Sequence, residues 1–378
     1  MTQSFLPYAR HVVDEDDIAA VIEVLRSDWL TTGPKVAQFE QAVADFVGNS
    51  HAVAVASGTA ALHAAIAAIG IGPGDEVIVP AMTFIATANS VVFQGGIPVF
   101  ADVEPETLLI DPDDVEKRIS ACTKAIIAVD YAGQPCDYDV LGEIAKKYRL
   151  ALVADACHSL GGEYKGRKVG TLADLTVFSF HPVKHITTGE GGMVVTNSVE
   201  LADKIRRFRN HGISTDFRQR EHAGTFYYEM TELGYNYRIT DIQCALGERQ
   251  LAKLPQWLER RRTIAGCYDE LLAGVTGVSP LGVSNDVRHA FHLYVVKLAE
   301  RYNRRQVFCQ VRDSGIGVNV HYLPVYLHPF YRERFGYAQG LCPKAESAYE
   351  HILSLPIWPG MHDDHVERVV KELCGVLP

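Results

Sequence analysis

Short apolar runs of strand length alternate with stretches of helical periodicity through the first half of this chain, and this alternation restricts the fold more than any other feature. The runs cover residues 51–56, 76–80, 98–102, 125–130, 150–154 and 175–180, and the stretches between them include 57–70, 83–93, 113–120 and 140–148. Strands that are apolar along their whole length and separated by helices are typical of a mainly parallel sheet with both faces covered. The pattern therefore predicts an α/β fold.

The remainder of the chain has a different pattern. Residues 211–238 show no clear period and are expected to form an ordered loop. Residues 240–272 are a helical stretch, broken by Pro255, that we expect to act as a spine between two lobes. Later residues predict strands at 291–297 and 317–321 and helices at 304–314, 343–353 and 363–374. Two prolines exclude a helix from 321–331, whose aromatic residues are suited to closing a pocket. We expect a large domain over 1–250 and a smaller α+β domain over 251–378.

Composition excludes several classes of protein. A net charge of −10, without long blocks of like charge, opposes non-specific binding to nucleic acid. The eight cysteines form no CxxC pair, which favours reduced thiols in a reducing compartment. Neither a secretory leader nor a long hydrophobic segment is recognisable. We therefore expect a soluble, cytoplasmic protein with no nucleic-acid or membrane partner.

Two charged residues lie where predicted strands end. Asp155 follows the apolar run 150–154, and Lys184 follows the run 175–180. Both are then at the carboxyl edge of the sheet, where open α/β folds bind ligands. A desolvated lysine can attack a carbonyl, and an aspartate can hold a pyridine nitrogen protonated, so the pair is suited to pyridoxal phosphate. Lys184 is the strongest catalytic candidate.

Each of these residues also has a plainer interpretation. A strand-end aspartate often caps a turn, and a lone lysine is often a solvated surface residue. Asp155, Cys157 and His158, or His181 with His185, are also alternatives as metal ligands. Pro182 lies between the last two histidines, and no HExxH motif or second ligand cluster is present, so we predict no metal.

A predicted phosphate site lies earlier in the chain. The run 51–56 leads directly into a helix that begins at Ser57, Gly58, Thr59 and Ala60. Free backbone amides and the helix dipole point toward an anion at such a helix start, although Ser-x-Thr is also simply a good cap. Phe84 opens the next helix at the same edge, where a flat aromatic ring is able to stack on a cofactor.

Several motifs together resemble one known family. They are SDWLTTGP, SGTAALHAA, DYAGQPCD, DACHSLGG, FSFHPVKHITTGEGG, LGYNYRITDIQCALG and VHYLPVY, and they extend from about Tyr8 to about Met361. The chain is similar to the DegT/DnrJ/EryC1/StrS aminotransferases, which act on nucleotide sugars. The resemblance implies the aspartate aminotransferase-like fold of type I pyridoxal phosphate enzymes, and a homodimer with shared active sites.

The resemblance also implies roles for individual residues. Lys184 matches the cofactor-linked lysine, Asp155 the partner of the pyridine nitrogen, His158 a neighbour of the phenolic oxygen and Phe84 the stacked aromatic residue. Matches to the phosphate contacts are Thr59, Ala60, Ser179 and, from the neighbouring subunit, Asn236. Positions matching the sugar pocket are Tyr8, Asp28, Thr31, His181, Arg238, His321 and Tyr322.

The motif around His181 resembles the branch of the family that acts on a C4 keto group. The implied reaction moves the amino group of L-glutamate to a nucleotide-linked 4-keto-6-deoxy sugar, UDP-linked, in pseudaminic acid biosynthesis. Another 4-keto or 3-keto sugar, linked to UDP, GDP or dTDP, is the alternative. A sister branch of sugar dehydratases has histidine in place of the lysine, so Lys184 favours transamination.

Overall fold

The computed structural model describes residues 4–215 and 217–377, and its central element is a seven-stranded sheet within those residues. In spatial order the strands are β1 (His51–Val55), β9 (Gly192–Thr196), β8 (Leu175–Ser179), β5 (Ala151–Asp155), β4 (Thr123–Val129), β2 (Glu76–Pro80) and β3 (Ile97–Ala101). Strand β9 is antiparallel to both of its neighbours, whereas the pairings from β8 to β3 are parallel. The predicted α/β fold with a mainly parallel sheet is confirmed.

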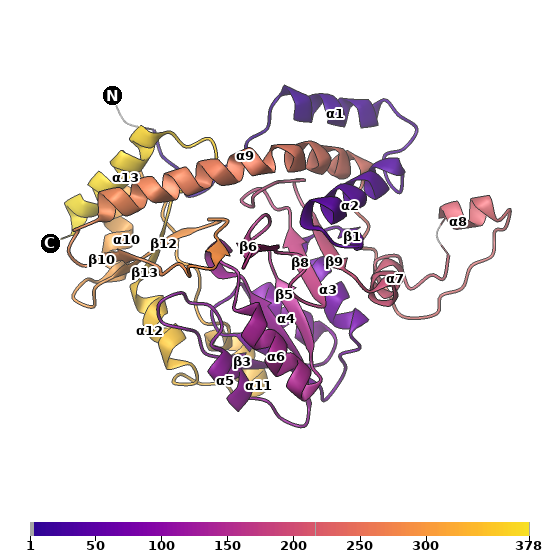
Figure 1. Ribbon diagram of the computed structural model, residues 1–378, viewed down its shortest axis with the longest axis horizontal. Helices are drawn as coiled ribbons and strands as arrows, with labels where there is room; N and C mark the ends of the chain where they lie inside the picture. The colour runs from indigo at the N-terminus through magenta and orange to yellow at the C-terminus, as the bar shows by residue number, and fades with distance from the viewer. Residues whose placement is uncertain (1–3, 216, 378) are drawn as a thin grey trace.

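Helices cover both faces of this sheet (Figure 1). They include α2 (Pro34–Val47), α3 (Gly58–Ala68), α4 (Ile85–Phe93), α5 (Pro112–Lys117), α6 (Tyr138–Tyr148) and α7 (Val199–Phe208). Crossovers between parallel strands are right-handed. The connections through α3 and α4 step one way along the sheet, and those through α5 and α6 step the other way, so the two pairs lie on opposite faces.

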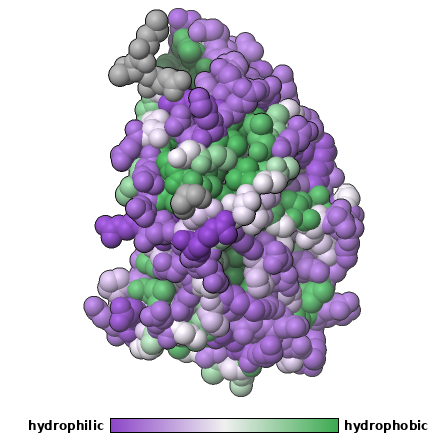
Figure 2. Space-filling model, turned by 90° about the vertical axis from the view of Figure 1, so that its left-hand side faces the viewer, coloured by the Kyte–Doolittle hydropathy of each residue, from purple (hydrophilic) through white to green (hydrophobic). Residues whose placement is uncertain are grey.

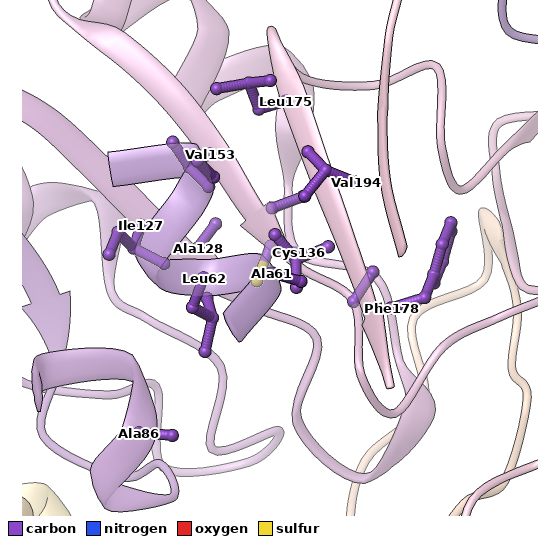
Figure 3. Packing of buried hydrophobic residues seen from close by; sticks show 14 of the residues in the cluster. Ala61, Leu62, Ala86, Ile127, Ala128, Cys136, Val153, Leu175, Phe178 and Val194 are labelled. Atoms are coloured by element: carbon purple, nitrogen blue, oxygen red, sulfur yellow. The ribbon is translucent and has the colours of Figure 1, made fainter. Parts of the chain in front are cut away.

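The main core lies on both faces of the sheet, and Figure 3 shows part of it, with residues of α3, α4 and the strands. Ala61 and Leu62 of α3 meet strand residues such as Val153, Leu175 and Val194, and all of them are at most 4% exposed. Strands buried along consecutive residues are expected where both faces of a sheet are covered. The close packing fixes the start of α3 against the carboxyl edge of the sheet.

The longest helix, α9 (Asp241–Leu272), runs without interruption through Pro255. The prediction that Pro255 breaks this helix was wrong. Proline removes one hydrogen bond and disfavours the helix interior, but buried leucines on either side, including Leu254 and Leu258, hold this helix against the main core. Farther along, Ile264 and Tyr268 belong to a second core cluster, so α9 does connect two packed regions.

The second core cluster includes a small antiparallel sheet. Its strands are β10 (Val278–Pro280), β12 (Tyr294–Leu298) and β13 (Ile352–Leu355), and α10 (Arg304–Asp313) and α13 (Asp363–Val376) pack nearby, with α12 (Pro343–His351) preceding β13. The predicted strand 317–321 is reduced to an isolated bridge between Asn319 and Ser354. The proposed domain boundary near residue 250 falls inside α9 and stays a prediction. The outer face of this region is mainly hydrophilic around a central hydrophobic area (Figure 2).

Helical turns occur in the segment from which two prolines were expected to exclude a helix. The 3-10 helix η2 (Val325–Leu327) follows Pro324, and α11 (Pro329–Phe335) begins at Pro329. Proline at the first helical position loses no intrahelical hydrogen bond, since that N–H has no partner in a helix. The prediction was therefore wrong for the end of this segment.

The predicted loop 211–238 is irregular apart from the short helix α8 (Phe217–His222) and two isolated bridges, Asn210 with Asn236 and Ile213 with Met230. Figure 1 shows α8 standing away from the rest of the molecule on its loop. Large apolar side chains are exposed just after it, with Phe226 at 92% and Leu233 at 70%.

The remaining elements are short or peripheral. They are α1 (Glu15–Leu25), η1 (Tyr131–Gly133), β6 (Glu163–Tyr164), β7 (Arg167–Lys168) and β11 (Val287–Arg288). Among the helices described, none combines the length and apolar character needed to cross a membrane.

Candidate active site

Lys184 lies in the turn that follows β8. Its backbone N–H donates to the carbonyl oxygen of His181 at 2.8 Å, and its side chain is half-buried. Burial of the amine lowers the pKa of Lys184, while Cys157 and Asp155 act in the opposite direction. A larger fraction of this amine is therefore neutral than in an exposed lysine, as a nucleophile or a base requires.

Asp155 is the last residue of β5, and its carboxylate is held by hydroxyl and amide donors. Oδ2 accepts a hydrogen bond from Thr87 Oγ1 at 2.7 Å, and Oδ1 accepts one from the N–H of Cys157 at 3.3 Å. Thr87 is in turn 2.8 Å from the hydroxyl of Thr83. Asp155 is only 6% exposed, so this network fixes its orientation. The sequence interpretation missed Thr83 and Thr87, although their spacing of four on a predicted helix was a signal.

The start of α3 forms a tight cradle with the end of β8. A Cβ atom added to Gly58 would lie 2.8 Å from Ser179 Cβ and 3.0 Å from its Oγ, so only glycine allows this approach. Ser57 Oγ accepts from the N–H of Ala60 at 3.1 Å, whereas Thr59 is exposed. The structure brings the predicted phosphate residues together, with the Ala60 amide already bonded to Ser57. Their contact with a phosphate remains a prediction.

His158 lies beside Tyr322 at the same edge. Its Nε2 is 3.3 Å from the Tyr322 hydroxyl, and the Tyr322 ring is 6.1 Å from that of Phe84. Burial, together with the nearby Lys184, holds the pKa of His158 well below its usual range, so the ring is neutral near pH 7. His158 Nδ1 is buried without a hydrogen-bond partner among the described residues. Such an atom is suited to a ligand that brings its own polar group.

Tyr8 and His321 adjoin this cluster. Their ring centroids are 5.8 Å apart, and His321 Nδ1 is 2.8 Å from Ser354 Oγ. Burial lowers the pKa of His321 to about 4 and raises that of Tyr8. His321 is therefore neutral near pH 7, but both of its ring nitrogens have partners, since Nε2 is 3.3 Å from Asn319 Nδ2. Tyr8 is then the better candidate of the two for a contact with a sugar hydroxyl. His181 is exposed, and its Nδ1 accepts from the N–H of Val183 at 3.4 Å.

The other predicted sugar and phosphate contacts lie elsewhere on the chain. Thr31 and Arg238 line a groove of about 760 Å³ whose described lining does not include Lys184. The Arg238 guanidinium donates to Asn210 Oδ1 at 2.8 Å, and Asn236 is exposed. Five arginines line the groove, and three of them are paired with acids: Arg206 with Asp203, Arg207 with Glu232 and Arg209 with Glu40, whereas Arg220 and Arg238 form no ion pair within the described residues. Asp28 is exposed and does not line it among the residues described. No contact between these residues and Lys184 is described within one chain, although the carbonyl oxygen of Tyr237, between Asn236 and Arg238, accepts from the Ala56 N–H at 2.9 Å just before α3.

The alternative of a metal site finds no support in the geometry. His181 is exposed, whereas His185 is buried with its Nε2 3.0 Å from the carbonyl oxygen of Ala290. In residues 4–215 and 217–377, no three histidine, cysteine or acidic side chains converge as a ligand set.

Pyridoxal phosphate fits the arrangement at this edge. Lys184 offers an amine for the aldehyde, Asp155 a fixed carboxylate for the ring nitrogen, and the Gly58–Ser179 cradle a place for the phosphate. The unpartnered Nδ1 of His158 is suited to the phenolic oxygen of the cofactor, and the exposed ring of Phe84 is suited to stacking on the cofactor ring. The residues present therefore match the group in both charge and shape.

Comparison with known proteins agrees with this chemistry. The model of the DegT/DnrJ/EryC1/StrS aminotransferase family matches residues 11–374. The chain is 38% identical over 386 residues to the UDP-4-amino-4-deoxy-L-arabinose–oxoglutarate aminotransferase of Shewanella sediminis, covering 100% of this chain and 99% of the relative.

Solved structures give the same result. Spr1654 of Streptococcus pneumoniae, described as a sugar aminotransferase and solved in its PMP form, has a TM-score of 0.94 and 32% identity, with 98% of both chains covered. Helicobacter pylori PseC, an aminotransferase involved in pseudaminic acid biosynthesis, has a TM-score of 0.93 and 34% identity, with 99% of both chains covered. The chain therefore belongs to the DegT/DnrJ/EryC1/StrS aminotransferase family, whose members use pyridoxal phosphate.

Proposed function

We propose that this aminotransferase moves the amino group of L-glutamate to C4 of a UDP-linked 4-keto-6-deoxy sugar. The proposed product is UDP-4-amino-4,6-dideoxy-N-acetyl-β-L-altrosamine, an intermediate of pseudaminic acid. The observation that carries amine transfer is the partly desolvated Lys184 close to the fixed carboxylate of Asp155. The similarity to PseC over nearly the whole chain supports this choice of sugar.

The chain's own groups have distinct roles in this proposal. When bound, pyridoxal phosphate supplies the carbonyl that accepts the amine and a ring that withdraws electrons. Lys184 takes a proton from the α-carbon of glutamate and returns protons during the second half of the reaction, because its lowered pKa keeps neutral amine available. Asp155, oriented by Thr87, provides the counter-charge for the ring nitrogen. His158 remains neutral and offers Nδ1 to the cofactor.

A homodimer with shared active sites is part of the proposal. Asn236 and the arginine-rich groove lie apart from Lys184 in one chain, and the exposed apolar segment after α8 is suited to burial against a second copy. The partner's groove then provides basic groups for the phosphates of the nucleotide sugar. Cytoplasmic location is supported by the absence of any disulfide among the eight cysteines, all of which lie in the described part of the chain.

A second candidate substrate is a UDP-linked 4-keto pentose. It is favoured by the 38% identity to the UDP-4-amino-4-deoxy-L-arabinose enzyme. The two sugars differ at C5, where the pentose has no methyl group, so a substrate panel separates them.

The test is to incubate the purified protein with glutamate, pyridoxal phosphate and a panel of UDP-, GDP- and dTDP-linked 4-keto and 3-keto sugars. Products are identified by mass and NMR, and 2-oxoglutarate release is measured in parallel. We expect stoichiometric 2-oxoglutarate and an amine at C4 of the UDP-linked 6-deoxy sugar. Amination of only the pentose would establish the second candidate, and loss of water from the sugar without 2-oxoglutarate would indicate a dehydratase.

A further inference from the structure

His292 packs directly against His158, the histidine proposed to face the cofactor. The two ring centroids are 4.3 Å apart with an interplanar angle of 39°. Both rings are almost fully buried, with His158 5% and His292 4% exposed. His292 lies just before β12, more than a hundred residues along the chain from His158. His292 takes no part in the proposed proton transfers.

The backbone around His292 is held by the loop that follows β4, through Ala132 and Gly133. Gly133, which has a φ of +104°, lies between this backbone and that of His158, since an added Cβ would be 2.7 Å from the carbonyl oxygen of His158 and 2.9 Å from the nitrogen of His292. The Leu293 N–H donates to the carbonyl of Ala132 at 3.1 Å, and the Ala290 N–H donates to that of Gly133 at 2.9 Å. A side chain at position 133 would push the two histidine segments apart.

A buried arginine holds the same backbone from α9. The guanidinium of Arg261 is 2% exposed and donates to the carbonyl oxygens of Phe291 at 3.0 Å and Ile357 at 3.2 Å, with a longer contact to His292 at 3.5 Å. No ion pair with an acid is formed by Arg261 in the described structure, so carbonyl oxygens hold it in place. The segment 290–293 is therefore fixed between α9 and the loop 131–136.

The rings themselves form a buried row. His185 lies 5.6 Å from His292, and its Nε2 must donate to the carbonyl oxygen of Ala290, which can only accept. The Nδ1 atoms of His158, His185 and His292 have no hydrogen-bond partner among the described residues. No hydrogen bond joins His158 to His292 among the described residues, so the two rings, tilted by 39°, meet in a packing contact.

We propose that His292 is a positioning residue: its flat ring, held by Gly133 and Arg261, fixes the orientation of the His158 ring in the cofactor pocket. Tyr322 contacts His158 through a single 3.3 Å hydrogen bond, and its ring centroid is 6.3 Å away, so the His292 ring at 4.3 Å is the closer of the two aromatic neighbours. This role rests on the proposed contact of His158 with the cofactor.

The test compares His292→Phe with His292→Leu. Phenylalanine retains a flat ring, and leucine fills much of the space without one. We expect His292→Leu to weaken pyridoxal phosphate binding by about 10-fold and to shift the absorbance maximum of the bound cofactor, as loss of a residue that orients a ligand typically does. His292→Phe should remain within about 2-fold of wild type with an unchanged spectrum. In turnover, kcat should fall for the leucine variant while the KM for the sugar stays constant.

His289→Ala is the matched control, since His289 is buried in the same segment but stacks on Phe291 rather than on His158. Thermal unfolding of each apo variant separates loss of packing from loss of orientation. Equal cofactor affinity and spectra for the leucine variant and wild type would overturn the proposal, as would equal losses in the phenylalanine and leucine variants. Cofactor binding is measured without any sugar, so its outcome does not depend on the assigned substrate.

Discussion

The pocket around Lys184 and the segment that follows α8 differ in how their side chains are covered. In the pocket, Asp155 and His158 are 6% and 5% exposed. In the segment, Phe226 and Leu233 are 92% and 70% exposed. One chain thus supplies the burial that sets the chemistry of Lys184, whereas it leaves apolar side chains of the segment in contact with water. This difference is what the proposed homodimer predicts: the groups around Lys184 are buried within one chain, and a second copy covers the segment.

The largest expected effect is at the centre of the pocket. Lys184→Ala should reduce turnover by about 100- to 10,000-fold, because the partly neutral amine of Lys184 carries the proposed proton transfers. Binding of pyridoxamine phosphate should persist. Steady-state kinetics and absorbance spectra measure both quantities. Lys165→Ala, which removes a surface pair with Asp139, is the control, and near-normal turnover in Lys184→Ala would refute the catalytic assignment.

A substitution in the exposed segment should change association rather than folding. Phe226→Ser is expected to weaken dimerisation by roughly 10-fold or more, since burying one phenylalanine contributes about 1.5–3 kcal/mol. Its unfolding midpoint as a monomer should stay unchanged. Sedimentation equilibrium measures the dissociation constant. Phe330→Ser, at a 50% exposed position on α11, serves as the control, and equal dissociation constants for both variants would show that the segment has another role.

Burial in the pocket region also predicts a dependence of stability on pH. Burial raises the pKa of Asp130 to about 6, despite hydrogen bonds from Ser159 at 2.5 Å and Tyr138 at 2.8 Å. Between pH 4 and 6 the folded protein therefore binds more protons than the unfolded chain, so this group stabilises the fold at low pH and the effect is lost as the pH rises through 6.

Asp130→Asn should remove this contribution, which amounts to about 1 kcal/mol between pH 5 and pH 7. Urea unfolding of both proteins at the two pH values measures this contribution. The free energy of unfolding of the variant, relative to that of wild type, should be higher at pH 7 than at pH 5. Parallel changes in the two proteins would show that Asp130 titrates normally in the fold.

Co-expression of two inactive variants tests whether each active site contains residues of both chains. Asn236→Asp places a negative charge where the partner's cofactor phosphate is proposed to bind, so this variant, like Lys184→Ala, should be inactive. Co-expression should restore about a quarter of wild-type activity, because half of the dimers are mixed and each mixed dimer has one intact site. Activity is compared with each variant alone. If mixing restores nothing although both variants dimerise, the sites are not shared.

Much of the fold was predictable because strands covered on both faces are apolar along their length. The positions of Asp155 and Lys184 at the carboxyl edge followed from that pattern. The continuity of α9 through Pro255 did not, since it depends on the packing of leucines against a core assembled from distant segments. Strand β13 was also missed, because Ile352–Leu355 follows α12 without a turn signal.

Within the site, the sequence identified residues that are charged or lie in a distinctive motif. It did not identify the residues that contact and orient them. Thr87 reaches Asp155 across 68 positions of sequence, and His292 reaches His158 across a longer interval. The spacing of four between Thr83 and Thr87 indicates only that the two hydroxyls share a helix face, and nothing near His292 in the sequence indicates a contact with His158. Their roles appear only when the chain has folded.

The 32-residue helix α9 has a mechanical consequence. Leu254 and Leu258 of this helix belong to the main cluster and Ile264 and Tyr268 to the second, so unfolding of α9 removes packing from both clusters. Heating should therefore produce one sharp calorimetric peak rather than two. The two clusters also cannot rotate relative to each other without bending α9.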